Sequence, residues 1–148
     1  MQIAERARRV EPFYVMEIAK AAAKLAAEVA HTARPMIFLN IGEPDFTAPE
    51  RVRQAAKRAV HEGHTQYTQA TGLPRLRVAI SHWYQQRFGV AIEPSRIVVT
   101  SGASAALQLA CLALVNPGDE ILMPDPSYPC NRQFVQAADG TARLLPTT

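Results

Sequence analysis

The chain has 148 residues, of which 48% are hydrophobic and 20% are charged, with a formal net charge of +3. These values are typical of one soluble globular domain that is long enough to bury a core. The arginines are spread from Arg6 to Arg143 without a dense run, and no helix-turn-helix or zinc-finger pattern occurs. The positive charge therefore indicates a solvated surface rather than a nucleic-acid interface.

Neither the first residues of the chain nor its apolar runs predict a secreted protein or a membrane protein. The longest apolar run, residues 103–115, is too short to cross a bilayer. The first residues, "MQIAERARRVEP", contain no apolar signal core. Their arginines suggest a transit peptide, but their glutamates argue against one. We therefore expect a cytoplasmic protein without a membrane partner.

The cysteines and histidines do not predict a metal site. Cys111 and Cys130 fit no metal-ligand spacing, and we expect both to stay reduced thiols, as is usual in a cytosol. His61 and His64 stand three residues apart, but glycine lies between them and no further ligands follow. A zinc site is therefore not predicted.

The first half of the chain is predicted to be mainly helical. Residues 12–31 combine strong helix formers with apolar residues at helical spacings. A short strand is predicted at Met36–Leu39, followed by a loop. A second helix is predicted from Pro49 to about Glu62, with Thr47 as its cap, and a third over "LPRLRVAISHWYQQRFG", which ends at Gly89.

In the second half, strands and helices are predicted to alternate. The predicted elements are a strand at 97–99, a helix at 103–115, a strand at 121–123, a helix at 127–138 and a strand at 142–145. Crossovers of this length allow only parallel pairing, and continuous apolar strands indicate a sheet covered on both faces. Because no helix follows the last strand, we expect the sheet to be incomplete in this chain.

Two turns that follow predicted strands are candidates for ligand binding. After Val99 comes Thr100-Ser101-Gly102-Ala103-Ser104, which opens a helix whose first N–H groups are free to bind an anion. By itself this turn is a weak signal, and its residues favour a plain capped helix start over an anion site. The second turn, "MPDPSYP", holds Tyr128 among prolines, where its ring could stack on a flat ligand or pack on its neighbours.

Together these segments resemble a known family. "NIGEPDFTAPERV", "GHTQYTQATGLPRLRVAIS", "RIVVTSGASAAL" and "NPGDEILMPDPSYP" occur in the order and spacing of the class I/II aminotransferases of pyridoxal 5'-phosphate (PLP) fold type I. The resemblance implies an α/β fold, in which a three-layer α/β/α large domain with a mostly parallel sheet is present only in part. It also implies a division into a small-domain segment, residues 1–48, and the N-terminal part of the PLP-binding large domain, residues 49–148.

The resemblance further implies roles for five residues. Ala103 and Ser104 would donate backbone N–H groups to the PLP phosphate, and Tyr128 would stack on the pyridine ring. Tyr67 would reach the phosphate in the neighbouring subunit of a homodimer. Gly42 would offer its N–H to the α-carboxylate of an amino acid or 2-oxo acid substrate.

The lysine that holds PLP as a Schiff base has no match here. Lys20, Lys24 and Lys57 all lie in polar positions of predicted helices and outside the family's lysine motif. The prediction is therefore the N-terminal part of an aminotransferase, inactive without the remaining segments. Two alternatives stay open: another PLP reaction of the same fold type, such as a β-lyase, and a non-catalytic fragment or split subunit that needs a partner chain.

Overall fold

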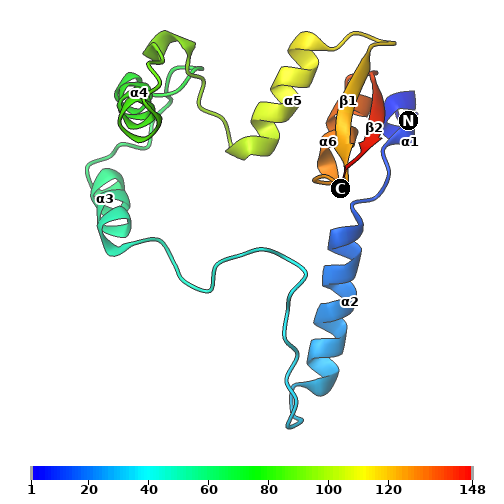
Figure 1. Cartoon of the computed structure of the whole chain (residues 1–148). Coiled ribbons are helices and arrows are strands. Elements are labelled where there is room, and N and C mark those ends of the chain that lie inside the picture. The colour runs from blue at the N-terminus through cyan, green and yellow to red at the C-terminus, as the bar shows by residue number, and fades with distance from the viewer. Residues whose placement is uncertain (1, 148) are drawn as a thin grey trace. The chain divides into compact units, whose positions relative to one another are not determined.

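A computed structural model describes residues 2–147 of the chain, as helices joined by loops and one small sheet (Figure 1). The chain folds as two compact units, each described by itself below. Unit 1 combines residues 1–44 with 107–148, and unit 2 comprises residues 45–106. The elements are α1 (Glu5–Arg9), α2 (Tyr14–Val29), α3 (Glu50–His61), α4 (Pro74–Phe88), η1 (Pro94–Arg96), α5 (Gly102–Leu114), β1 (Glu120–Asp125), α6 (Cys130–Ala137) and β2 (Thr141–Pro146).

The centre of unit 1 is a parallel strand–helix–strand motif. β1 pairs with β2 in parallel, from Glu120 opposite Thr141 to Asp125 opposite Pro146. α6 forms the crossover and packs on β2, as Figure 1 shows beside the two arrows. Val135 of α6 is only 1% exposed. The predicted parallel pairing of these two strands is confirmed, and the sheet in the described residues has two strands.

A close backbone approach supports the core of this motif. Gly140 lies just before β2, and a Cβ built on it would lie 2.5 Å from Val115 Cγ1 and 3.0 Å from Val135 Cγ1. Its N–H donates to the carbonyl oxygen of Val135, which closes the end of α6. Glycine is therefore required here because valine side chains occupy the space that a side chain would need.

Unit 2 is built from helices and tight turns. α4 begins with Pro74 and ends before Gly89, which adopts the left-handed conformation (φ 68), so the predicted stop is confirmed. The Ser81 hydroxyl donates to the Ile92 carbonyl oxygen at 2.6 Å and joins α4 to the segment that follows it. No large apolar side chain among the described residues of this unit is fully buried.

Several sequence-based predictions of local structure are wrong. Residues 36–39 and 97–99 are not strands, because neither segment pairs with another strand among the described residues. Thr47 does not cap α3: the N-cap is Pro49, without a side-chain hydrogen bond. α6 begins at Cys130 rather than at residue 127, with Pro129 as its N-cap. The short helix α1 is an addition to the predicted elements.

Candidate functional site

The turn before α5 presents open backbone donors. Gly102 has a φ of 83°, a conformation that costs glycine little, and a Cβ built on it would meet no atom within 4 Å. The Gly102 N–H donates to the Thr100 carbonyl at 2.8 Å, and the Thr100 hydroxyl donates to the Gly102 carbonyl at 2.9 Å. The next two N–H groups, of Ala103 and Ser104, belong to the first helical turn and have no acceptor within the helix. Both residues are exposed. This turn can accept an anion such as a phosphate.

Tyr67 lies on the loop between α3 and α4, and its side chain is fully exposed. The C-terminal end of this loop is attached to Val99. The Val99 N–H donates to the Thr71 carbonyl oxygen at 3.1 Å, and Gly72 lies against the Val99 side chain. Val99 stands three residues before Gly102. The loop that carries Tyr67 and the turn that carries Ala103 and Ser104 are therefore joined within unit 2.

Tyr128 and Gly42 belong to unit 1. The Tyr128 ring is 54% exposed and meets the Phe13 ring edge-on, with centroids 6.2 Å apart. The neighbouring Cys130 raises the pKa of the Tyr128 phenol, first through side-chain hydrogen bonding and then through the negative charge of its thiolate form. Gly42 lies in an exposed loop, and a Cβ on it would meet no atom within 4 Å. Both residues are accessible, as a ring that stacks on a ligand and an N–H that binds one require.

The predicted site residues therefore fall into two sets. Ala103, Ser104 and Tyr67 lie in unit 2, whereas Tyr128 and Gly42 lie in unit 1. The roles that the resemblance implies for these five residues, and the predicted division at residue 48, stay predictions. The donor set of the α5 turn nevertheless fits a phosphate group, because it combines unpaired N–H groups, a helix N-terminus and open space.

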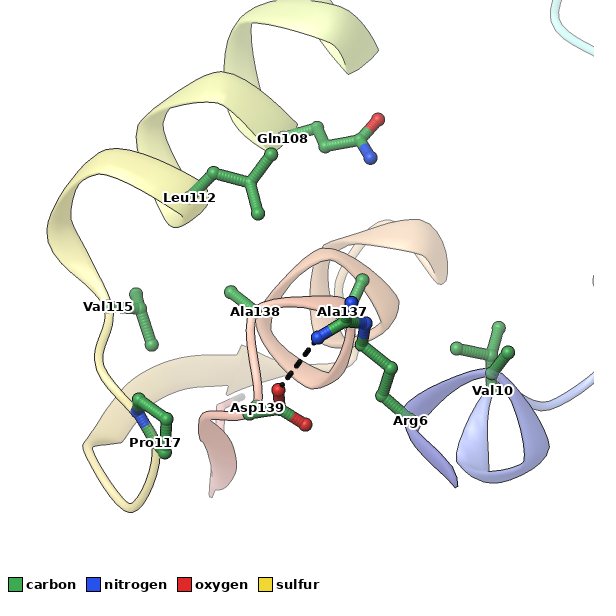
Figure 2. A pocket seen from close by; sticks show the side chains of 10 residues that line it. Arg6, Val10, Gln108, Leu112, Val115, Pro117, Ala137, Ala138 and Asp139 are labelled. Atoms are coloured by element: carbon green, nitrogen blue, oxygen red, sulfur yellow. Dashed lines mark hydrogen bonds and ion pairs between the residues drawn. The ribbon is translucent and has the colours of Figure 1, made fainter. Parts of the chain in front are cut away.

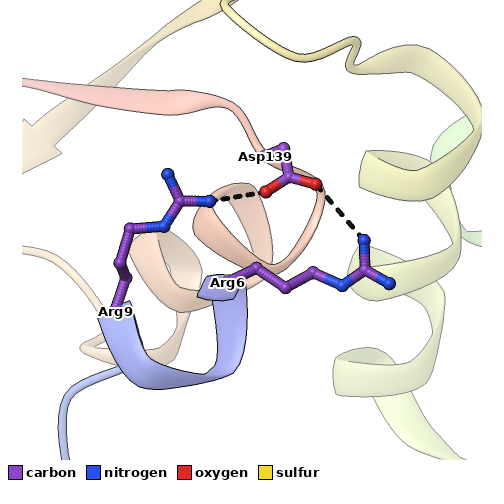
Figure 3. A network of polar contacts seen from close by, with 3 residues as sticks. All are labelled: Arg6, Arg9 and Asp139. Atoms are coloured by element: carbon purple, nitrogen blue, oxygen red, sulfur yellow. Dashed lines mark hydrogen bonds and ion pairs between the residues drawn. The ribbon is translucent and has the colours of Figure 1, made fainter. Parts of the chain in front are cut away.

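A cavity in unit 1 involves none of the predicted site residues. It has a volume of about 510 Å³ and lies between α1, the end of α5 and the end of α6 (Figure 2). Its walls are mainly apolar, as Leu112 and Val115 illustrate, with Arg6 and Asp139 at one side. Asp139 accepts hydrogen bonds from Arg9 at 2.6 Å and from Arg6 at 3.3 Å (Figure 3). These contacts attach α1 to the end of α6.

Sequence reasoning missed this ion-pair cluster and one partly buried arginine. From the sequence, the N-terminal arginines predict no contact with the rest of the chain, whereas Arg6 and Arg9 bind an aspartate about 130 residues away along the chain. The spread of arginines along the sequence predicts a solvated surface, but the Arg77 side chain is partly buried and donates to residues of two other segments. No local pattern distinguishes Arg77 from the exposed Arg75.

The described residues contain neither a candidate metal site nor a candidate membrane-spanning helix. Among residues 2–147, no group of three or more histidine, cysteine or acidic side chains is placed to hold a metal ion. Of the helices in the same range, none combines the length and the apolar character that a membrane span requires. Cys111 and Cys130 are free thiols.

Comparison with known proteins defines the class. The family model "Aminotransferase class I and II" matches residues 34–148. A valine–pyruvate aminotransferase of Mycobacterium tuberculosis is 42% identical over 86% of this chain and 32% of its own length. A solved aminotransferase from the same organism superposes with a TM-score of 0.88 at 39% identity, over 100% of this chain and 37% of that one. An alanine aminotransferase of Pyrococcus furiosus gives a TM-score of 0.89 at 37% identity, over 99% and 37%.

The chain belongs to the class I and II aminotransferase family. The predicted fold class is confirmed as an incomplete α/β domain of fold type I, since solved aminotransferases match this chain along its whole length. The chain spans about a third of the length of the curated relatives it matches.

Proposed function

We propose that this chain is the N-terminal part of a PLP-dependent aminotransferase that moves an amino group between an amino acid and a 2-oxo acid. The observation that carries the proposal is the α5 turn. It offers the free N–H groups of Ala103 and Ser104 beside the open position of Gly102, inside the region that matches the family. The relatives' names include valine–pyruvate and aspartate aminotransferases, so the proposal is made at the level of the amino-group transfer.

Each predicted residue has a task in this proposal that its chemistry can perform. Ala103 and Ser104 donate N–H groups to the cofactor phosphate, with help from the helix dipole. The accessible Tyr128 ring stacks on the pyridine ring, and Gly42 binds the substrate carboxylate. Tyr67 completes the phosphate site of a second subunit, so we propose a homodimer. When bound, PLP supplies the aldehyde and the electron-accepting ring that amino-group transfer needs.

None of the three lysines of this chain is suited to bind the PLP aldehyde, so the amine has to come from another segment. Lys20, Lys24 and Lys57 all lie exposed on α2 and α3, and Lys20 pairs with Glu17 at 2.8 Å. A lysine nucleophile is normally activated by burial or by a neighbouring cation. We therefore propose that the 148-residue chain does not catalyse transamination alone.

A chimera tests the proposal. Residues 1–148 replace the equivalent segment of the solved M. tuberculosis aminotransferase, and activity is followed with a panel of amino acids and 2-oxoglutarate. We expect transamination by the chimera and none by the isolated chain above free PLP. The parent enzyme is the positive control. Turnover by the isolated chain, or a folded chimera that neither binds PLP nor transaminates, would contradict the proposal.

The same assay separates the alternatives. A β-lyase would release pyruvate from a sulfur amino acid without a 2-oxo acid acceptor. A non-catalytic subunit would leave the chimera folded but inactive. The curated relatives are named as aminotransferases, which favours transfer over elimination.

The homodimer has a separate test. A Tyr67→Phe chimera is mixed with a chimera that lacks its catalytic lysine, and activity is measured after subunit exchange. If each site takes Tyr67 from the neighbouring subunit, the mixed dimer contains one site with both lesions and one site with neither, so activity returns. No recovery despite verified exchange would place Tyr67 in its own subunit's site or outside it.

A further inference from the structure

Arg77 links two segments of unit 2 that are separate in the sequence. It lies in the first turns of α4, and its partly buried guanidinium has two acceptors. Nη2 donates to Oε1 of Gln69, on the loop that carries Tyr67, at 3.4 Å. Nη1 donates to the carbonyl oxygen of Pro94, in η1, at 3.4 Å. Its third donor, Nε, is buried as well and has no hydrogen-bond partner among the described residues.

A second link joins the same loop to the chain just before α5. The Val99 N–H donates to the Thr71 carbonyl oxygen at 3.1 Å. Gly72 adopts a φ of 97°, and a Cβ built on it would lie 2.6 Å from Val99 Cγ2. The loop is therefore attached through Gln69 to Arg77 and through Thr71 to Val99, which stands directly before the Thr100–Ser104 turn.

We infer that Arg77 is a positioning residue that fixes the conformation of the Tyr67 loop, from which Tyr67 reaches the cofactor phosphate of the neighbouring subunit. The inference rests on the proposed function and extends it to a residue that touches neither cofactor nor substrate. Arg77 acts through its guanidinium, in which one terminal nitrogen donates to the Gln69 side-chain amide oxygen and the other to the Pro94 backbone carbonyl oxygen. Tyr67 itself is fully exposed, so the conformation of its loop has to be set by contacts elsewhere in the loop.

Neither a lysine nor a neighbouring arginine can do the same. A lysine ammonium is a point charge, whereas the planar guanidinium holds its donors in a fixed fork. Arg75 lies on the same helix two residues earlier, but it is exposed and makes no hydrogen bond or ion pair within residues 2–147. Arg75 therefore provides the matched control for charge and helix position.

The test uses the chimera of this chain with the M. tuberculosis aminotransferase. Arg77→Ala, Arg77→Lys and Arg75→Ala variants are compared by hydrogen exchange of the apo protein and by PLP titration. We expect faster exchange of the 68–72 amides in both Arg77 variants, with unchanged exchange in α4. We also expect about tenfold weaker PLP binding, because a displaced Tyr67 would lose its charge-assisted hydrogen bond to the cofactor phosphate. Arg75→Ala should match the parent chimera in both measurements.

A double variant distinguishes positioning from general stabilisation. If Arg77 acts through Tyr67, then Arg77→Ala should weaken PLP binding less than about twofold once Tyr67→Phe is present, because effects on one shared interaction do not add. Additive losses, unchanged 68–72 exchange or faster exchange throughout α4 would each overturn the inference. If the parent chimera does not bind PLP, the proposed function fails, and loop exchange alone still decides whether Arg77 holds the loop.

Discussion

Two short apolar runs of similar composition adopt different structures in this chain: one forms a paired strand and the other does not. Ile121–Met123 lies within β1 and forms a parallel ladder with β2. Ile97–Val99 is also extended at Ile97 (φ −105, ψ 126), but it is joined to the Tyr67 loop by a single backbone hydrogen bond, from Val99 to Thr71. An apolar run thus favours an extended conformation, whereas a strand also requires a neighbour. β1 finds one because α6 returns the chain alongside it.

The two regions also differ in how deeply their apolar side chains are buried. Val135 of α6 is 1% exposed in unit 1, whereas Val98 of unit 2 is 51% exposed. Unit 1 has a crossover helix above its strands, and α1 contacts that helix in turn. The extended segment of unit 2 relies instead on the hydrogen bond from Val99 to Thr71 and on a tight contact between Val99 and Gly72.

A charge placed at Val135 should destabilise the protein far more than a charge placed at Val98. Val135→Asp buries a carboxylate without a partner and should destabilise unit 1 by about 3–5 kcal/mol. Val98→Asp, at an exposed position, should cost less than about 0.5 kcal/mol. Urea unfolding followed by circular dichroism measures both. Similar losses for the two variants would mean that α6 does not provide the core of unit 1.

The contact between Gly72 and Val99 should be the main support of the extended segment. Gly72→Ala adds a Cβ where Val99 lies and forces alanine into a positive φ, at a cost of about 1–3 kcal/mol. Gly63 also has a positive φ (77) but no atom within 4 Å of a built Cβ, so Gly63→Ala should cost only about 1 kcal/mol. Hydrogen exchange of the Val99 amide reports the difference, and Val99→Ala should reduce the cost of Gly72→Ala. Equal costs for the two glycines would contradict the contact.

Releasing α1 should have a smaller effect. Asp139→Asn removes the charge that pairs with Arg6 and Arg9, and asparagine tolerates the positive φ of 61 at this position. Because both arginines are largely exposed, we expect a loss below about 1 kcal/mol that disappears at high salt. Trypsin cleavage within residues 5–9 should become faster at low salt. Unchanged cleavage would show that these ion pairs do not hold α1.

The exposed pair between Glu120 and Arg143 should give the smallest effect. Hydrogen bonding and then the charge of Arg143 lower the pKa of the Glu120 carboxyl below its ordinary value of 4.5. The contribution of the pair is therefore complete above pH 4.5 and is lost as the pH falls through the lowered folded-state pKa. An NMR titration of the Glu120 carboxyl should show its pKa rising in Arg143→Gln. An unchanged pKa would exclude the cross-strand pair in solution.

The sequence predicts the helices of this chain better than its strands, for a physical reason. Helix positions depend on local signals, such as Pro74 at the start of α4 and Gly89 after its end. Strands depend on distant partners, which is why the predictions for residues 36–39 and 97–99 are wrong while those for β1 and β2 are confirmed. α1 has only five residues and is attached through Asp139, so no local pattern reveals it.

The candidate site shows the same division between local and distant information. The turn at Gly102 can be read from its residue types, because a glycine followed by a helix start is a local signal. The links that attach the Tyr67 loop cannot be read in this way, since the side chain of Arg77 binds both Gln69 and Pro94, which are distant from each other in the sequence. The roles of Ala103, Ser104, Tyr128, Tyr67 and Gly42 stay predictions for experiment.

The most direct test of the proposed function is the PLP affinity of the chimera with Ala103→Pro. Proline removes one N–H from the turn, although the first turn of a helix otherwise tolerates it. Ala103→Gly, which keeps the N–H, is the matched control. We expect the proline variant to lose about 1–3 kcal/mol of PLP binding free energy, and the glycine variant to lose much less. Unchanged PLP affinity in a folded Ala103→Pro variant would show that the turn before α5 does not bind the cofactor phosphate.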